Sequence, residues 1–226
     1  MPKVVAISDT HMCHEQLVVP RCDLLVHAGD VTRYGSYEEL IAFLTWFGAQ
    51  PARFRVFVAG NHDSCCEPDP QRVRRDAARL GVHYLYEDGC TLAGLQIWGS
   101  PIVPELVLVP GAQRSKPCRR DWAFCRARGS EIIRQHWQSV PEGLDVLVTH
   151  GPPLGAGDRV LVDSRVGCSE LCRAVTRAQP RLHVFGHIHE DAGEHRLEGC
   201  STRFINACSL RLSPSWRTRR PVELEL

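Results

Sequence analysis

The stretch LHVFGHIHED, residues 182–191, places two histidines one residue apart after an apolar run and a glycine. Short apolar runs bounded by turn residues are typical of strands that are buried on both faces. Alternate side chains of a strand lie about 6.5–7 Å apart, too far for one ion to bind both histidines. Because Gly186 permits a turn, we expect the strand to end at or just before Gly186, and His187 and His189 to bind different metal ions. We expect that neither Glu190 nor Asp191, the two acidic residues that follow, binds a metal ion directly.

Further apolar runs of this kind occur along the chain, and segments with helical periodicity separate them. The predicted strands are residues 3–8, 23–29, 54–60, 95–100, 144–150 and 181–187, and the predicted helices are residues 36–50, 69–81, 130–140 and 168–179. Such alternation predicts a layered α/β fold with parallel strands. An antiparallel hairpin is expected at 196–207. Because no repeat or break in composition interrupts the pattern, we expect residues 1–226 to form a single domain.

Composition excludes several classes of protein. The chain has 226 residues, 43% of them apolar, and a net charge of +1, so its overall charge does not attract nucleic acid or an anionic membrane. The first residues lack the basic and apolar regions of a secretory signal, and no apolar stretch is long enough to span a bilayer. We therefore expect a cytoplasmic protein with no membrane partner. The sequence leaves the oligomeric state open.

The cysteine content is high, with 11 residues and no Cys-x-x-Cys pair. Without zinc-type spacing or a secretory signal, such cysteines are expected to remain reduced and to pack as small apolar side chains. The sequence therefore predicts that all 11 thiols are free. This prediction includes the adjacent Cys65 and Cys66, whose role stays open.

Metal-capable side chains follow five of the predicted strands. They are Asp9 and His11, then Asp30, then Asn61, His62 and Asp63, then His150, and finally His187 and His189. A single histidine at a strand end is more often a hydrogen-bonded structural residue than a ligand. Five such strand ends are different, because open α/β sheets bind their ligands beyond the carboxyl ends of the strands. The sequence therefore predicts a metal site at this edge.

The types of ligand indicate the chemistry. Two carboxylates, one amide oxygen and four imidazoles suit Mn, Fe, Zn or Ni, and no thiolate favours a softer metal. Seven ligands are too many for one zinc ion, so we expect two ions, about 3.5–4 Å apart. Two divalent ions, two aspartates and a bridging hydroxide keep a net charge of about +1, which favours a phosphoryl anion as substrate.

The series Asp-x-His, Gly-Asp, Gly-Asn-His-Asp, His-Gly and Gly-His-x-His, between residues 9 and 189, resembles the signature of the calcineurin-like metallophosphoesterase superfamily. The resemblance implies an αββα sandwich, in which two packed mixed β-sheets are flanked by helices. It implies that one ion is bound by Asp9, His11 and His189, the other by Asn61, His150 and His187, and that Asp30 bridges them. It further implies that His62 is the general acid and that Asp63 orients it.

A finer resemblance is to the metallophosphoesterase-domain-containing (MPPED) branch, through stretches such as DLLVHAGDVT at 23–32 and VTHGPPLG at 148–155. It implies hydrolysis of phosphodiesters, cyclic nucleotides included, with two divalent ions. Mn is the preferred metal, and Fe, Zn, Ni and Co are alternatives. Some members carry glycine at the position of His187, so the histidine here implies an intact dinuclear centre. The chain departs from the branch at residues 102–128, which leaves the substrate open.

Three functions remain open. The first is a phosphodiesterase that cleaves a small phosphoester substrate with a hydroxide activated by the dinuclear centre. The second is a nuclease or RNA-processing enzyme whose basic 114–128 loop contacts nucleic acid, although a solvated loop is the simpler interpretation. That loop contains Arg114, Lys116, Arg119, Arg120, Arg126 and Arg128, interleaved with Trp122 and Phe124. The third is a catalytically weak binding scaffold, against which the complete ligand series argues.

The remaining histidines have simpler interpretations. His27 and His183 lie inside apolar runs and are expected to be hydrogen-bonded core residues. His14, three residues after His11, is expected to be a solvated loop residue rather than a contact to substrate phosphate.

Overall fold

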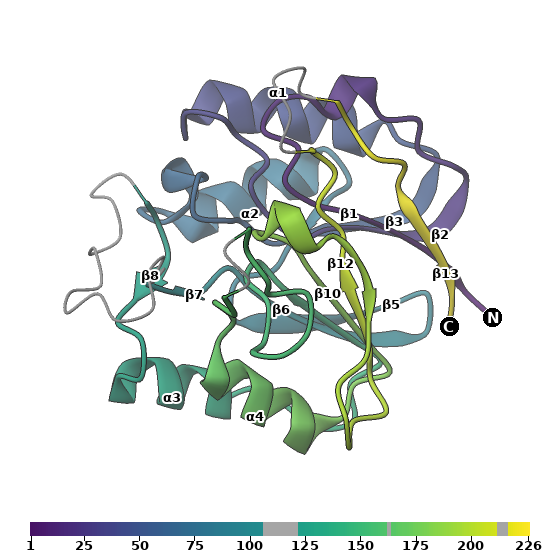
Figure 1. Cartoon of the computed structure of the whole chain (residues 1–226). Helices are drawn as coiled ribbons and strands as arrows, with labels where there is room; N and C mark the ends of the chain where they lie inside the picture. The colour runs from purple at the N-terminus through teal and green to yellow at the C-terminus, as the bar shows by residue number, and fades with distance from the viewer. Residues whose placement is uncertain (106–121, 162–163, 212–216) are drawn as a thin grey trace.

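Two β-sheets lie face to face in the computed structural model, which describes residues 1–105, 122–161, 164–211 and 217–226. Helices α1 (Tyr37–Gly48) and α2 (Pro70–Arg79) cover one sheet, and α3 (Glu131–Gln138) and α4 (Ser169–Ala178) cover the other (Figure 1). The predicted αββα sandwich is therefore confirmed, as are all four predicted helices.

The first sheet has the order β13-β1-β2-β3-β4 among the described residues. Strands β1 (Lys3–Ile7), β2 (Cys22–His27), β3 (Ala52–Phe57) and β4 (His83–Tyr84) run parallel. The C-terminal strand β13 (Val222–Glu225) pairs antiparallel with β1. Both termini of the chain therefore lie in this sheet (Figure 1).

The second sheet has the order β11-β12-β10-β9-β6-β5 among the described residues. Its parallel strands are β12 (Arg203–Asn206), β10 (Leu182–Phe185), β9 (Val146–Thr149) and β6 (Leu95–Ser100). Its antiparallel edges are β11 (Gly193–His195) and β5 (Asp88–Leu92). All six predicted strands are present, and the predicted C-terminal hairpin is β11–β12, although its first arm ends one residue before the expected range. A short parallel pair, β7 (Val103–Pro104) and β8 (Cys125–Arg126), stands apart.

Alternation along each strand builds two layers of core. Val4 and Ala6 of β1 belong to the cluster between the sheets, where they meet residues such as Val146 of the second sheet. Val5 and Ile7 belong instead to the cluster under the helices. Because successive side chains point to opposite faces, a strand must be apolar throughout to fill both layers.

The described part of the chain corrects one prediction about cysteines. Nine cysteines are free, Cys65 and Cys66 among them, with their sulfurs 4.0 Å apart. Cys125, however, is disulfide-bonded, so the prediction of all thiols reduced is wrong. A disulfide needs only two suitably placed Cβ atoms, which spacing along the sequence does not reveal. The cytoplasmic location stays a prediction, and this disulfide counts against it. No helix within the described residues is both long enough and apolar enough to cross a membrane.

Candidate metal centre

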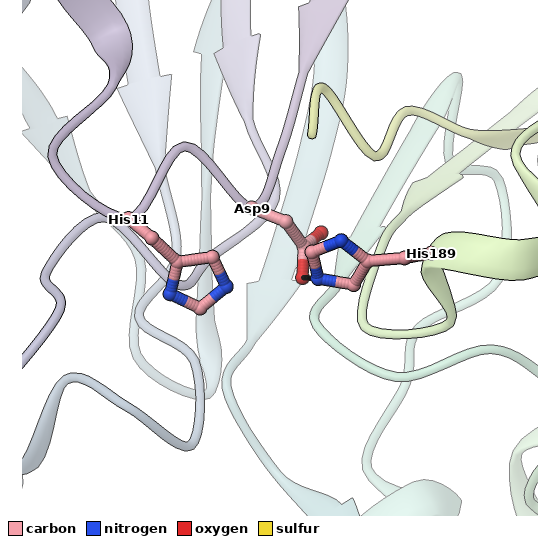
Figure 2. Close-up of side chains that lie close together, drawn as sticks. All are labelled: Asp9, His11 and His189. Atoms are coloured by element: carbon pink, nitrogen blue, oxygen red, sulfur yellow. Dashed lines mark ion pairs between the residues drawn. The ribbon is translucent and has the colours of Figure 1, made fainter. Parts of the chain in front are cut away.

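The loops that follow the parallel strands of both sheets meet at one edge and carry the predicted ligands. Asp9 and His11 follow β1, and His189 follows β10. Figure 2 shows these three side chains approaching one another from two parts of the chain, with a dashed line for the ion pair of Asp9 and His189. Their ligand atoms lie within 4.8 Å of one another, and the Nε2 of His189 is 3.4 Å from the Oδ1 of Asp9. This trio forms the first half of the centre.

The second half lies beside it. The ligand atoms of Asp30, His150 and His187 also lie within 4.8 Å of one another. The Oδ1 of Asn61 is 2.9 Å from the Nε2 of His150, which adds an amide oxygen to this group. His187 and His189 thus fall into different groups, as expected from their spacing.

Asp30 connects the two halves. Its Oδ2 is 3.6 Å from the Nε2 of His11, and its Oδ1 is 3.4 Å from the Nε2 of His150. One carboxylate oxygen therefore faces each half, which is the arrangement that a bridging ligand requires. All seven predicted ligands are brought together in the grouping that the family resemblance implies.

Hydrogen bonds to the outer ring nitrogens test whether three of these histidines fit a metal. The Nδ1 atoms of His11, His150 and His189 lie 3.1, 2.9 and 3.3 Å from backbone carbonyl oxygens. Because a carbonyl only accepts, each Nδ1 carries a proton. Each Nε2 therefore faces the centre and offers its lone pair to an ion, the usual arrangement of a metal-ligating histidine. These donors fit a divalent metal.

The electrostatics of the centre call for positive charge. Burial by itself would raise the pKa of Asp9 and of Asp30. A hydrogen bond and the charge of His189 lower the pKa of Asp9 overall, and the charge and a hydrogen bond of His150 lower that of Asp30. Burial disfavours a charged His150, yet the charge of Asp30 outweighs it and raises the pKa of His150 to about 9. Two buried carboxylates therefore require a cation beside them. A divalent ion would supply at Nε2 the charge that a proton supplies otherwise.

Strained backbone forms part of the site. Asp9, His11, Asp30 and His187 have φ angles of 52°, 40°, 57° and 70°, in the left-handed region that non-glycine residues rarely adopt. Such strain persists only where the surrounding structure enforces it, and it concentrates at functional sites. The turn after β10 therefore occurs at His187.

Gly186 has a different role from the one expected. β10 does end just before it, at Phe185, as predicted. However, Gly186 lies outside the left-handed residues of the described chain, and a Cβ there would lie 2.0 Å from the Oδ2 of Asp9 and 2.1 Å from the Oγ of Ser8. The glycine thus provides space for Asp9 rather than the freedom to turn.

His62 lies at the edge of the centre. Its ring centroid is 4.8 Å from that of His11, and its ligand atom forms a third potential metal group with those of His11 and Asp30. Its backbone N–H donates to the Oδ1 of Asp30 over 2.9 Å. The position fits a proton donor to a bound substrate and also lies within reach of an ion. Its assignment as general acid therefore stays a prediction.

Asp63 is fully buried, and its carboxylate binds backbone. It accepts hydrogen bonds from the N–H groups of Val31, Thr32 and Gly60, at 3.2, 2.8 and 2.8 Å, and from the Thr32 hydroxyl at 2.7 Å. These contacts join the loop after Asp30 to the loop before Asn61. They do not reach the His62 ring, so the orientation of His62 by Asp63 stays a prediction, and the contacts assign Asp63 to loop positioning.

Two buried histidines contact residues next to the predicted ligands, and both are hydrogen-bonded as predicted. The Nε2 of His27 lies 3.0 Å from the hydroxyl of Thr10, and the Nε2 of His183 lies 2.8 Å from the hydroxyl of Thr149. Each threonine is the immediate neighbour of a ligand. Burial lowers the pKa of both histidines to about 3, so both are neutral supports.

Sequence analysis missed Cys208, which contacts the predicted metal ligand Asp9 directly. Its buried thiol donates to the Oδ2 of Asp9 over 3.0 Å, while the His187 N–H donates to both Asp9 oxygens at 3.1 and 3.0 Å. These contacts hold Oδ2 on the side of Cys208 and leave Oδ1 toward His189. Cys208 belongs to no motif, and its β-bridge to Ser8 brings it near Asp9.

His14 is not the solvated loop residue that was expected. It is buried, and its ring lies 4.9 Å from that of Trp46 and 5.7 Å from that of Phe43, both on α1. The three-residue spacing from His11 gave no sign of this, because a tight turn between the two histidines redirects the chain.

A hollow of about 240 Å³ opens over the centre. Six of the predicted site residues line it, together with Trp122, Val160, Ile188 and Glu190. Neither Glu190 nor the following Asp191 belongs to the potential metal groups of the described residues, as expected.

The predicted basic loop is only partly described. Arg114, Lys116, Arg119 and Arg120 lie outside the described residues. Arg126 pairs with Glu67 over 3.4 Å, and the guanidinium of Arg128 donates to the carbonyls of Glu105, Val166 and Gly167. Phe124 is fully buried. These three residues therefore contact the fold, and contact of the loop with nucleic acid stays a prediction.

A model of the calcineurin-like phosphoesterase family matches residues 2–191 of the chain. The match covers the whole ligand series, and the chain therefore belongs to the calcineurin-like phosphoesterase family. Members typically bind divalent metals, and the His/Asp groups described above are candidates for that role. The protein is thus a metal-dependent phosphoesterase.

Relatives identify the branch within this family. A UPF0046 protein of Caenorhabditis elegans is 36% identical over 96% of this chain and 73% of its own length. Human metallophosphoesterase domain-containing protein 1 is 34% identical over 94% of this chain and 68% of its own length. Both confirm the predicted MPPED branch. The solved structure of TT1561 of Thermus thermophilus, at 12% identity, has a TM-score of 0.60 over 91% of this chain and 88% of its own, a likeness of fold alone.

Proposed function

We propose that the protein is a phosphodiesterase that hydrolyses small phosphodiesters, cyclic nucleotides among them, with two divalent metal ions. Mn is the preferred metal, with Fe, Zn, Ni or Co as alternatives. The observation that carries the proposal is the pair of ligand groups on either side of Asp30, one facing each of its oxygens. Two ions held this way would supply Lewis acidity and lower the pKa of water enough for hydrolysis near neutral pH.

The chain's own residues would complete the reaction. The seven predicted ligands would hold the two ions, and Asp9 and Asp30 would lower the positive charge of the centre. His62, which lines the hollow beside His11, would donate a proton to the leaving oxygen. Positioned proton donors of this kind contribute roughly 10²- to 10⁴-fold to a rate.

The charge around the hollow favours a diester over a monoester. Among the described lining residues none is lysine or arginine, and Glu190 adds a carboxylate at the rim. A diester carries one negative charge, whereas a monoester near neutral pH carries almost two. The second charge would meet no cationic side chain in this described lining. Similarly, the structural roles of Arg126 and Arg128 favour a small substrate over nucleic acid.

The test is a comparison of substrates on the Mn-loaded protein. Bis(p-nitrophenyl) phosphate, p-nitrophenyl phosphate, cyclic AMP isomers and a short RNA are assayed with and without a chelator. We expect the diester to exceed the monoester in kcat/KM, chelation to abolish turnover, and Mn to restore it. His83→Ala is the control, since His83 is an exposed histidine on β4 outside the hollow. A preference for the monoester, or turnover without metal, would contradict the proposal.

A further inference from the structure

We propose that Trp122 is a specificity-determining residue, whose indole stacks on the base of a nucleoside phosphodiester substrate. The inference rests on the proposed phosphodiesterase function and adds the residue that would recognise the base. Its basis is the position of the Trp122 indole, which lines the hollow over the metal centre and has no predicted metal-binding or catalytic role.

Trp122 lies across the two halves of the centre. Its ring centroid is 6.1 Å from that of His62 and 6.4 Å from that of His187, and it lines the same hollow. These ring contacts are tilted by 46° and 80°, so neither histidine stacks in parallel on the indole. Aromatic rings prefer offset-stacked or edge-on neighbours, and a planar ligand would find a stacking partner here.

The backbone beside Trp122 is fixed to the site. The N–H of Ala123 donates to the carbonyl of Asn61 over 2.9 Å, and Asn61 is itself a predicted ligand. The next residue, Phe124, is fully buried, and its N–H donates to the Oε1 of Glu67 over 3.2 Å. These hydrogen bonds hold the backbone that follows Trp122 beside the metal centre, which reduces the entropy lost when a ring binds to the indole.

The side of the hollow that Trp122 occupies matches the side of the leaving group. If His62 protonates the leaving oxygen, the group attached to that oxygen lies next to the His62 ring and hence next to the indole. Val160 and Ile188 add apolar side chains to the same lining. An aromatic and apolar surface suits a nucleobase, which offers a planar aromatic face, whereas an open-chain glycerol group has no ring to stack on it.

The expected loss of affinity when Trp122 is replaced follows from the known strength of stacking between bases and aromatic side chains. Removing one such side chain typically weakens binding by roughly 5- to 150-fold. The effect should be confined to ligands with a base, because the phosphate contacts are unchanged. A ligand that differs only in the base therefore isolates the contribution of Trp122.

The experiment compares adenosine 5′-monophosphate with ribose 5-phosphate, by calorimetry on the Mn-loaded protein. We expect the nucleotide to bind at least fivefold more tightly to the wild type. Trp122→Leu should abolish this preference, and Trp122→Phe should retain most of it because a phenyl ring still stacks. Trp46→Leu is the matched control, since Trp46 is half-buried on α1 and outside the hollow. An unchanged preference in Trp122→Leu would overturn the inference.

Turnover of bis(p-nitrophenyl) phosphate separates this inference from the proposed function. If the wild type hydrolyses no diester at all, the proposed function fails, whatever the calorimetry gives. If diester hydrolysis is intact while Trp122→Leu binds both ligands as the wild type does, only the role of Trp122 fails. When both hold, Trp122→Leu should raise KM for aromatic diesters more than it lowers kcat.

Discussion

Replacement of Cys208 by alanine should weaken metal binding, because its thiol and the His187 N–H both donate hydrogen bonds to the Asp9 carboxylate. The His187 N–H lies 3.1 and 3.0 Å from the two Asp9 oxygens, so it alone does not fix which oxygen faces the metal. The thiol, 3.0 Å from Oδ2, makes that choice. Loss of such an outer contact typically costs 10- to 100-fold in metal affinity, and we expect Cys208→Ala to lie in this range.

The assay is Mn binding in competition with a fluorescent chelator, followed by elemental analysis of the dialysed protein. Cys208→Ser should restore most of the affinity, because a hydroxyl is also a donor of similar size. Cys22→Ala, a buried cysteine on β2, controls for the loss of a thiol in the core. Wild-type Mn affinity in Cys208→Ala would refute the reasoning, as would a serine variant no better than alanine.

Three further variants test the site and its support. His62→Ala should lower kcat by roughly 10²- to 10⁴-fold with metal content intact; an emptied centre in a folded protein would instead make His62 a ligand. His187→Gly should weaken the second metal site and change the preference among metals, and an unchanged metal titration would exclude the ligand role. Burial lowers the pKa of His183 to about 3. The side chain therefore stays neutral in the folded protein but takes up a proton near pH 6.5 in the unfolded chain, so the free energy of unfolding falls as the pH drops below 6.5. His183→Gln should remove about 2 kcal/mol of the loss in unfolding free energy between pH 7 and 5, measured by urea denaturation at each pH; an unchanged pH dependence would contradict a buried neutral imidazole.

Buried parallel strands made most of the fold predictable. Strands such as β9 and β10 are buried along their whole length and mostly apolar, because they fill a layer of core on each face. The sequence did not indicate β5 and β13, which are edge strands with alternately exposed residues. Polar edge strands resemble loops in composition, and only pairing with a neighbour defines them.

The ligands were predictable for a related reason. Each follows the end of a buried strand, and the ends of parallel strands meet at one edge. Contacts that depend on sheet register were not predictable, as the bond of Cys208 to Asp9 illustrates across 199 residues. The same holds for Asp63, since its hydrogen bonds to backbone become visible only when two loops are placed side by side.

The central claim, two ions bridged by Asp30, is tested most directly by electron paramagnetic resonance of the Mn-loaded protein with elemental analysis of the same sample. The account predicts two Mn ions per chain with a spin-coupled spectrum, as expected for ions about 3.5–4 Å apart. Asp30→Ala should lose both the coupling and the activity. A fully active wild-type protein with one Mn ion per chain, or with two uncoupled ions, would contradict the account.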